Sequence, residues 1–186
     1  MNFLSPSPSY NQSSAFLVTV LATAFPNLRE VNLSNTNATG RALKTLSTTC
    51  SRLVKITHNN IQIFLNIAID GGNMIRAKNL KELYMDNSVF KDTQSSVDRM
   101  SNLDDNDNLK NQILFYKCSS KVLERVSIKN AHCFNGNNNR TTPLSQKALI
   151  KFVRNAPPSL RWFQSSLTDA NTNMLRSERP EIELVN

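Results

Sequence analysis

Few residues in this chain are suited to covalent or acid–base chemistry. It has three cysteines, Cys50, Cys118 and Cys133, and two histidines, His58 and His132. A catalytic cysteine and its histidine normally come from distant parts of a sequence, so the adjacent His132 and Cys133, expected in a loop after a strand, form a poor nucleophile–base pair. The chain contains no phosphate-binding glycine loop, dinucleotide motif, zinc-protease motif or nucleophile elbow. The sequence therefore predicts no enzyme, no catalytic residue, no cofactor and no small-molecule substrate.

A run of acidic and amide side chains, Asp104–Asn108, imitates the start of a calcium-binding loop. Such a loop needs a glycine at its sixth position and a bidentate glutamate at its twelfth. This chain has Leu109 and Phe115 at those places. We therefore predict no metal site, and we interpret residues 91–111 as a polar, acidic insertion.

The charge of the chain is unevenly distributed. The net charge is +8 over 186 residues, and ten bases against one acid fall between positions 110 and 161. Such a basic segment can attract nucleic acid, an anionic membrane or an acidic protein. An apolar fraction of 39% allows one domain with a core. The longest apolar stretch, Ala15–Phe25, is too short to span a bilayer, and we expect no membrane partner. We interpret the stretch as a buried helix, with a signal peptide and secretion as the less favoured alternative because no basic side chain precedes it.

The spacing of the cysteines bears on the compartment. Three cysteines cannot all pair within one chain, and no C-x-x-C spacing occurs. This pattern is unlike a secreted disulfide scaffold and fits a reducing compartment. We therefore expect a cytoplasmic protein, with the nucleus as the alternative.

Short aliphatic motifs of the form L-x-x-L-x-L recur along the chain. Their first leucines are Leu28, Leu53, Leu80, Leu123 and Leu160. Alternation places the apolar residues of each motif on one face of a short strand and the intervening residues on the other face. The first two intervals are 25 and 27 residues long. The longer later intervals contain the insertion at 91–111 and an Asn-rich loop at 135–142.

Helical spacing of apolar residues occurs between the strand motifs. Two such faces are Leu43, Leu46 and Cys50, and Leu144, Ala148 and Phe152. Segment 61–78 has no clear helical pattern, and Ile67–Gly72 could be an additional strand. A strand–helix unit of this size cannot bury its apolar face alone, so the units are expected to stack into one continuous core.

The segment FPNLREVNLSNTNATGRALKTLSTTCSRL, with Cys50 three residues before Leu53, resembles a cysteine-containing leucine-rich repeat. PLSQKALIKFVRNAPPSL resembles the same unit without its cysteine. Such repeats occur in F-box leucine-rich-repeat proteins and in ribonuclease-inhibitor-like horseshoes, and the closing segment is similar to the ends of diatom-type leucine-rich-repeat proteins. The resemblance implies an α/β solenoid of about five repeats over residues 14–186, with a parallel concave sheet, after a disordered segment 1–13.

The resemblance also implies that partners bind on the concave, strand-lined face. The outward strand positions form three columns: Glu30, Lys55, Glu82, Arg125 and Trp162; Asn32, Thr57, Tyr84, Ser127 and Gln164; and Ser34, Asn59, Asp86, Lys129 and Ser166. Tyr, Trp and Arg side chains supply much of the energy of protein binding. We therefore expect a binding site for an unidentified protein formed by Glu82, Tyr84, Arg125, Lys129 and Trp162. The alternative for Trp162 is packing against a C-terminal cap.

Two functional interpretations follow. The favoured one is a protein-interaction scaffold, which the resemblance would extend to the substrate-recognition part of a ubiquitin-ligase adaptor. The alternative is nucleic-acid binding through residues 110–161, where bases are interleaved with aromatic residues. Against it, Lys147, Lys151 and Arg154 share one helix face, as expected for a solvated surface, while Phe152 and Phe163 occupy predicted core positions.

Overall fold

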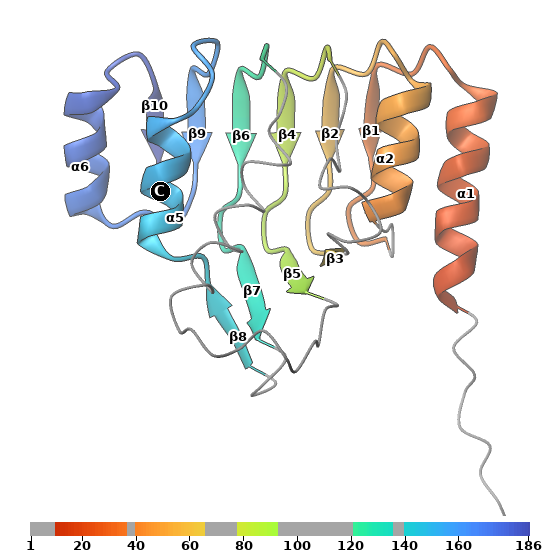
Figure 1. Ribbon diagram of the computed structural model, residues 1–186, viewed down its shortest axis with the longest axis horizontal. Coiled ribbons are helices and arrows are strands. Elements are labelled where there is room, and N and C mark those ends of the chain that lie inside the picture. Colours follow the sequence, from red (N-terminus) through yellow and green to blue (C-terminus); the bar gives the residue numbers. More distant parts are fainter. Residues whose placement is uncertain (1–9, 37–39, 66–77, 93–120, 136–139) are drawn as a thin grey trace, which may run out of the picture.

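The computed structural model describes residues 10–36, 40–65, 78–92, 121–135 and 140–186. Its larger sheet contains six strands, all paired in parallel and arranged in chain order. These strands are β1 (Glu30–Asn32), β2 (Lys55–Thr57), β4 (Glu82–Tyr84), β6 (Arg125–Ser127), β9 (Trp162–Gln164) and β10 (Glu183–Val185) (Figure 1). The chain is thus an α/β protein, and the predicted parallel sheet is confirmed.

The strands are paired in one constant register. Their central residues form a row of aliphatic and aromatic side chains on the covered face: Val31, Ile56, Leu83, Val126, Phe163 and Leu184. Because successive side chains of a strand point to opposite faces, the first and third residue of each strand lie on the other, uncovered face. The first two predicted columns of outward residues are therefore rows across the sheet, and the third column lies just beyond the strand ends.

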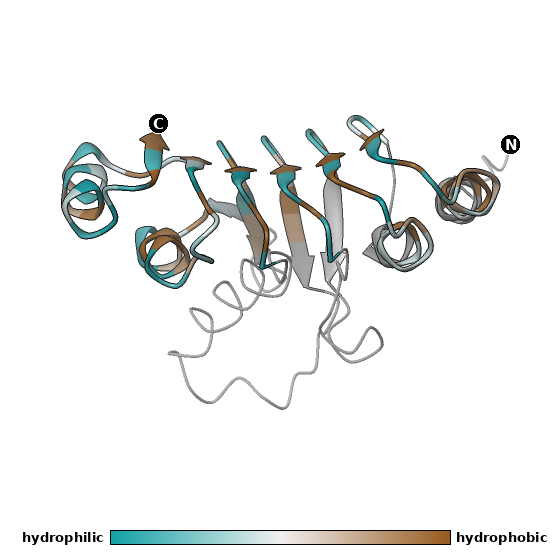
Figure 2. Cartoon of the chain, turned by 90° about the horizontal axis from the view of Figure 1, so that it is seen from above, coloured by the Kyte–Doolittle hydropathy of each residue, from teal (hydrophilic) through white to brown (hydrophobic). Residues whose placement is uncertain are grey.

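Helices cover the two ends of the sheet. α1 (Tyr10–Ala24) and α2 (Gly40–Thr49) pack at the N-terminal end, and α5 (Gln146–Arg154) and α6 (Asp169–Glu178) lie at the C-terminal end. Figure 2 shows these helices behind and beside the larger sheet, whose opposite face is uncovered and gently concave. α1 begins at Tyr10, inside the segment 1–13 for which we predicted disorder, and it contains most of Ala15–Phe25. The predicted burial of that helix is wrong, because Val18 and Ala22 are buried whereas Leu17, Val20 and Phe25 are exposed at the end of the sheet.

A second sheet, which we did not predict, continues from the ends of the larger one. It consists of β3 (Gln62–Leu65), β5 (Val89–Asp92), β7 (His132–Asn135) and β8 (Arg140–Pro143), in that order. The first three strands are parallel, and β8 runs antiparallel to β7. In Figure 1, β5 and β7 lie beyond the arrowheads of β4 and β6. Because neighbouring strands of the larger sheet run parallel, the segments that follow them leave the sheet side by side. These segments can therefore pair with one another as a second sheet.

The second sheet corrects two expectations. His132 and Cys133 lie within strand β7 and not in a loop, because β5 and β8 pair with that segment on both sides. The ends of the Asn-rich segment 135–142 belong to the β7–β8 hairpin rather than to a loop. The additional strand expected at Ile67–Gly72 and most of the insertion 91–111 lie outside the described residues, whereas β3 occupies 62–65.

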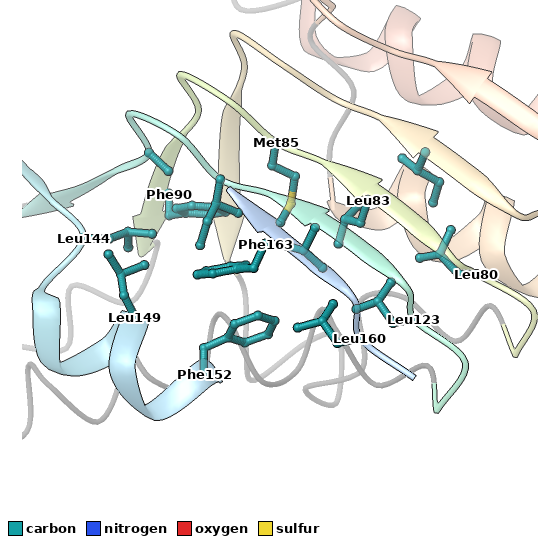
Figure 3. Close-up of a cluster of buried hydrophobic side chains, with 14 of the residues drawn as sticks. Leu80, Leu83, Met85, Phe90, Leu123, Leu144, Leu149, Phe152, Leu160 and Phe163 are labelled. Atoms are coloured by element: carbon teal, nitrogen blue, oxygen red, sulfur yellow. The ribbon is translucent and has the colours of Figure 1, made fainter. Parts of the chain in front are cut away.

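One core joins the sheet, the helices and the second sheet. Figure 3 shows Leu80, Leu123 and Leu160 in a row, with Phe90 reaching the same cluster from β5. The rings of Phe152 on α5 and Phe163 on β9 have centroids 5.0 Å apart. Ala148 and Phe152 of the predicted helix face are buried on α5, and Leu144 is buried just before that helix begins. Leu46 is buried on α2, and Cys50 is buried directly after its end. His58, which directly follows β2, is also fully buried.

A turn with a left-handed residue follows each of the first four motif strands. Asn35, Asn60, Asn87 and Asn130 have φ between 54° and 60°, and each lies seven residues after the first leucine of its motif. Asparagine tolerates this region better than other residues with a Cβ atom, because its short polar side chain can bond locally. The repeated turn follows the strand at the same point in each of these four units.

The Cys50 thiol links two neighbouring units. Its Sγ lies 3.6 Å from the main-chain oxygen of Phe25 and 3.9 Å from that of Ala22, at the end of α1. Main-chain carbonyls at a helix C-terminus lack intrahelical donors, and the thiol adds a donor there beside the Leu28 N–H, which also donates to the Phe25 oxygen at 3.0 Å. Burial raises the pKa of Cys50, which keeps it in the thiol form that can donate. The residue is thus a buried structural cysteine.

Candidate functional site

Five side chains from four neighbouring strands meet near the middle of the uncovered face. We call Lys55, Glu82, Tyr84, Arg125 and Trp162 the aromatic–charge cluster. The register brings them together, since Lys55, Glu82, Arg125 and Trp162 occupy the same position on β2, β4, β6 and β9. Tyr84 lies two residues after Glu82 and therefore on the same face.

The two aromatic rings of the cluster approach each other across an intervening strand. The ring centroids of Tyr84 and Trp162 are 6.3 Å apart, with 49° between the ring planes. β6 separates their strands, and two strand spacings amount to about 10 Å. Ser127, the β6 residue paired with Tyr84 and Gln164, is 0% exposed, although it is on the uncovered face. The two rings therefore lean toward each other across β6.

A cation lies over each ring. The guanidinium carbon of Arg125 is 4.6 Å from the centroid of the Trp162 ring. The Lys55 ammonium is 5.4 Å from the centroid of the Tyr84 ring. Both distances are within the range over which the ring quadrupole attracts a cation. Lysine, tyrosine, tryptophan and arginine thus form one continuous array across the sheet.

Glu82 neutralises only one of these two cations. Its carboxylate lies 3.6 Å from the Lys55 ammonium and accepts a hydrogen bond of 3.0 Å from the Tyr84 hydroxyl. Arg125 is the cross-strand neighbour of Glu82 on the other side, but its guanidinium is stacked on Trp162 instead. Within the ranges that the structure describes, no carboxylate forms an ion pair with Arg125.

The third predicted column has a different role from the one we expected. Its side chains bind backbone N–H groups of adjacent units: Asn59 N–H donates to Ser34 Oγ (3.0 Å), Asp86 N–H to Asn59 Oδ1 (2.8 Å), Lys129 N–H to Asp86 Oδ1 (2.8 Å) and Asn130 N–H to Ser166 Oγ (3.0 Å). These bonds extend the sheet pairing beyond the strand ends. The column therefore holds the units together.

Lys129 stands apart from the other predicted site residues. Its ammonium donates to the main-chain oxygen of Asn186 at 3.2 Å, near the C-terminal end of the sheet. The structure thus brings together Glu82, Tyr84, Arg125 and Trp162 but not Lys129. Conversely, Lys55 joins the cluster although we did not select it. The signal was present in the sequence, because Lys55 is the charged neighbour of Glu82 in the same column.

The alternative interpretation of Trp162 concerned a C-terminal cap. The closing elements α6 and β10 are present, and Trp162 is aligned with Glu183 of β10. Its ring, however, makes its aromatic and cation contacts with Tyr84 and Arg125, on the N-terminal side of β9. Trp162 is half-buried and accessible from the uncovered face.

The basic segment 110–161 is only partly described, since residues 110–120 lie outside the described ranges. Lys147, Lys151 and Arg154 are exposed on α5, and Arg154 binds Glu178 through two N–O contacts of 2.7 Å. Phe152 and Phe163 are buried in the core, so neither can stack on a base. These helix residues form a solvated outer surface, as predicted.

The residues considered for catalysis or metal binding do not converge. His132 and Cys133 are consecutive in β7, so their side chains point to opposite faces, and Cys133 is buried. In the described ranges, no three His, Cys, Asp or Glu side chains are placed to hold a metal ion. The acidic run Asp104–Asn108 lies outside those ranges. None of the helices described has the length and apolar character needed to cross a bilayer.

No protein-family model and no curated protein matches this chain. The fold and the site therefore define it as an α/β protein with a six-stranded parallel sheet, one face of which carries the aromatic–charge cluster.

Proposed function

We propose that this chain is a leucine-rich-repeat protein whose uncovered sheet face binds a protein partner. Three features support the repeat assignment: the strands follow chain order, their aliphatic residues are in register, and a left-handed asparagine follows each of the first four motifs. Stacked strand–helix units with an open concave sheet are typical binding surfaces of repeat proteins. In this proposal the chain is a recognition module and not an enzyme.

The aromatic–charge cluster is the observation that carries the proposed function. Tyrosine, tryptophan and arginine are the residues most enriched among binding hot spots. Here Tyr84, Trp162 and Arg125 already contact one another in the unbound chain, so less side-chain entropy is lost when a partner docks. By resemblance to F-box leucine-rich-repeat proteins, the partner would be a protein delivered to a ubiquitin ligase.

Affinity capture with quantitative mass spectrometry tests the binding site. The bait is the wild-type chain, compared with the double variant Tyr84→Ala/Trp162→Ala. A matched control, Lys147→Ala/Lys151→Ala, changes two exposed residues on α5. We expect a specific partner to be retained by the control and lost from the aromatic variant. Equal capture by all three baits would exclude the cluster as the binding site, provided that circular dichroism shows each bait to be folded.

A salt titration separates this function from nucleic-acid binding. The probe is a single-stranded oligonucleotide, titrated into the wild type and into Lys147→Ala/Lys151→Ala/Arg154→Ala. Phosphate contacts release counterions, so genuine nucleic-acid binding weakens steeply as salt increases. We expect no salt-sensitive binding that depends on these three bases. Its appearance in the wild type and loss in the variant would contradict the proposed function.

A further inference from the structure

The charges of the aromatic–charge cluster are not balanced. Glu82 contacts Lys55 and the Tyr84 hydroxyl, whereas the Arg125 guanidinium has no acidic partner among the described residues. Arg125 is exposed, and it is held over the Trp162 ring at 4.6 Å. An arginine stacked on an aromatic face keeps its N–H donors directed outward in the plane of the guanidinium. The middle of the face thus presents an oriented set of cationic donors.

We propose that the partner is a protein segment that places an aspartate or glutamate carboxylate on Arg125 and an adjacent apolar side chain against Tyr84 and Trp162. This inference rests on the proposed function and specifies the chemistry of the partner. A carboxylate matches the planar fork of a guanidinium in a bidentate, charge-assisted pair. The half-buried rings beside it offer an apolar surface for the neighbouring residue.

The charges around the cluster favour a single carboxylate over a polyanion. Glu30, Glu82, Asp86 and Glu183 all lie on the uncovered face with Arg125. A nucleic acid carries a phosphate charge at every nucleotide and would meet these carboxylates along the sheet. A single acidic side chain needs only one cation without an acidic partner, and Arg125 supplies it within the cluster. Repulsion between the phosphates and these carboxylates therefore disfavours a nucleic acid as the partner.

Selection of displayed peptides tests the inference. The probe is a random linear peptide library on yeast, sorted against the full folded chain, with each selected peptide then titrated in solution. Trp162 is the single tryptophan, so its fluorescence reports binding at the cluster in every protein that keeps it, and binding to Trp162→Ala is measured by the anisotropy of a labelled peptide. Four variants are compared with the wild type: Arg125→Glu, Tyr84→Ala, Trp162→Ala and Arg52→Glu. The last one is a matched charge reversal at an exposed turn residue outside the cluster.

We expect the selected peptides to be enriched in Asp or Glu next to an apolar residue. Their affinity should fall about tenfold or more in Arg125→Glu, as for removal of a hot-spot residue, and should be unchanged in Arg52→Glu. Replacing the acid of a selected peptide by lysine should restore binding to Arg125→Glu. Such a reciprocal charge exchange also shows that the variant is folded.

Two other outcomes would overturn the inference in distinguishable ways. In the first, the selected peptides are not enriched in acids, require Tyr84 and Trp162, and bind Arg125→Glu with the same affinity as the wild type. This result would refute a partner carboxylate on Arg125 and leave the proposed function standing. If no selected peptide is sensitive to Tyr84 or Trp162, both are refuted. Binding of a single-stranded oligonucleotide that changes Trp162 emission and requires Arg125 would assign the site to phosphate instead.

Discussion

The rings of Tyr84 and Trp162 lie 6.3 Å apart although strand β6 runs between their strands. The small Ser127, the β6 residue paired with Tyr84, favours this closeness, because a larger side chain there would crowd the Tyr84 ring. Ser127 is fully buried, and its hydroxyl lies within hydrogen-bonding distance of Asp86 Oδ1 and, at 3.2 Å, of Gln164 Oε1. This small neighbour of Tyr84 thus also links the cluster to the bonds that hold adjacent units together.

Substitutions of Ser127 should separate these two roles. Ser127→Ala removes the hydroxyl without adding volume, and we expect a loss of about 1 kcal/mol in the free energy of unfolding with the ring contact kept. Ser127→Leu inserts bulk beneath the rings and should cost about 1–3 kcal/mol. Urea unfolding measures both losses. A leucine variant as stable as the wild type would show that the rings do not cover this position.

Replacing Arg125 should expose the tryptophan. The guanidinium lies over the Trp162 ring, so Arg125→Ala removes cover from the indole. We expect a larger acrylamide quenching constant and a red-shifted emission in Arg125→Ala, with no such change in Arg52→Ala. Because Trp162 is the single tryptophan, the signal has no other source. Identical quenching in all three proteins would contradict the stacked arrangement.

The left-handed turns predict that Asn60 tolerates substitution by glycine better than substitution by a β-branched residue. Its φ is 56°, a region that glycine adopts freely and a β-branched residue adopts only with strain. Asn60→Gly should therefore leave the free energy of unfolding within about 0.5 kcal/mol of the wild type. Asn60→Val should lower it by about 1–2 kcal/mol. Thermal and urea unfolding of the two variants measure the difference, and equal stability would rule out the left-handed turn.

The C-terminal ion pairs predict a loss of stability in acid. Hydrogen bonds from Arg154 lower the pKa of Glu178, and those from Arg179 lower the pKa of Glu181, both from the ordinary value of 4.5. The unfolded chain therefore binds protons first as the pH falls, and the stabilisation is fully present only above pH 4.5. We expect the free energy of unfolding to decrease as the pH is lowered through the depressed pKa values.

Glu178→Gln provides the control for this pH dependence. The variant lacks the titrating carboxylate, so its stability should depend less on pH in the acid range than that of the wild type. The difference between the two proteins should be present at neutral pH and shrink as the pH falls below 4.5. Urea unfolding at a series of pH values measures it. Parallel curves for the two proteins would show that Glu178 does not contribute.

Much of the architecture could be derived from the sequence alone. The positions of Leu53, Leu80, Leu123 and Leu160, with alternation in the residues after them, determined which segments are strands and which side chains face outward. Parallel pairing of consecutive units then placed Tyr84, Arg125 and Trp162 near one another. These features are local or repetitive, so the hydrophobic periodicity of the sequence predicts them.

Only the tertiary structure decided how the outward side chains pair and what surrounds the strands. Glu82 lies between Lys55 and Arg125 in the register, and it contacts Lys55 because Arg125 is stacked on Trp162. Lys129 contacts Asn186, a residue far away in the sequence. The strands of the second sheet form because neighbouring segments of the same chain lie beside them and supply hydrogen-bond partners. Such choices depend on contacts between distant segments, which no local pattern records.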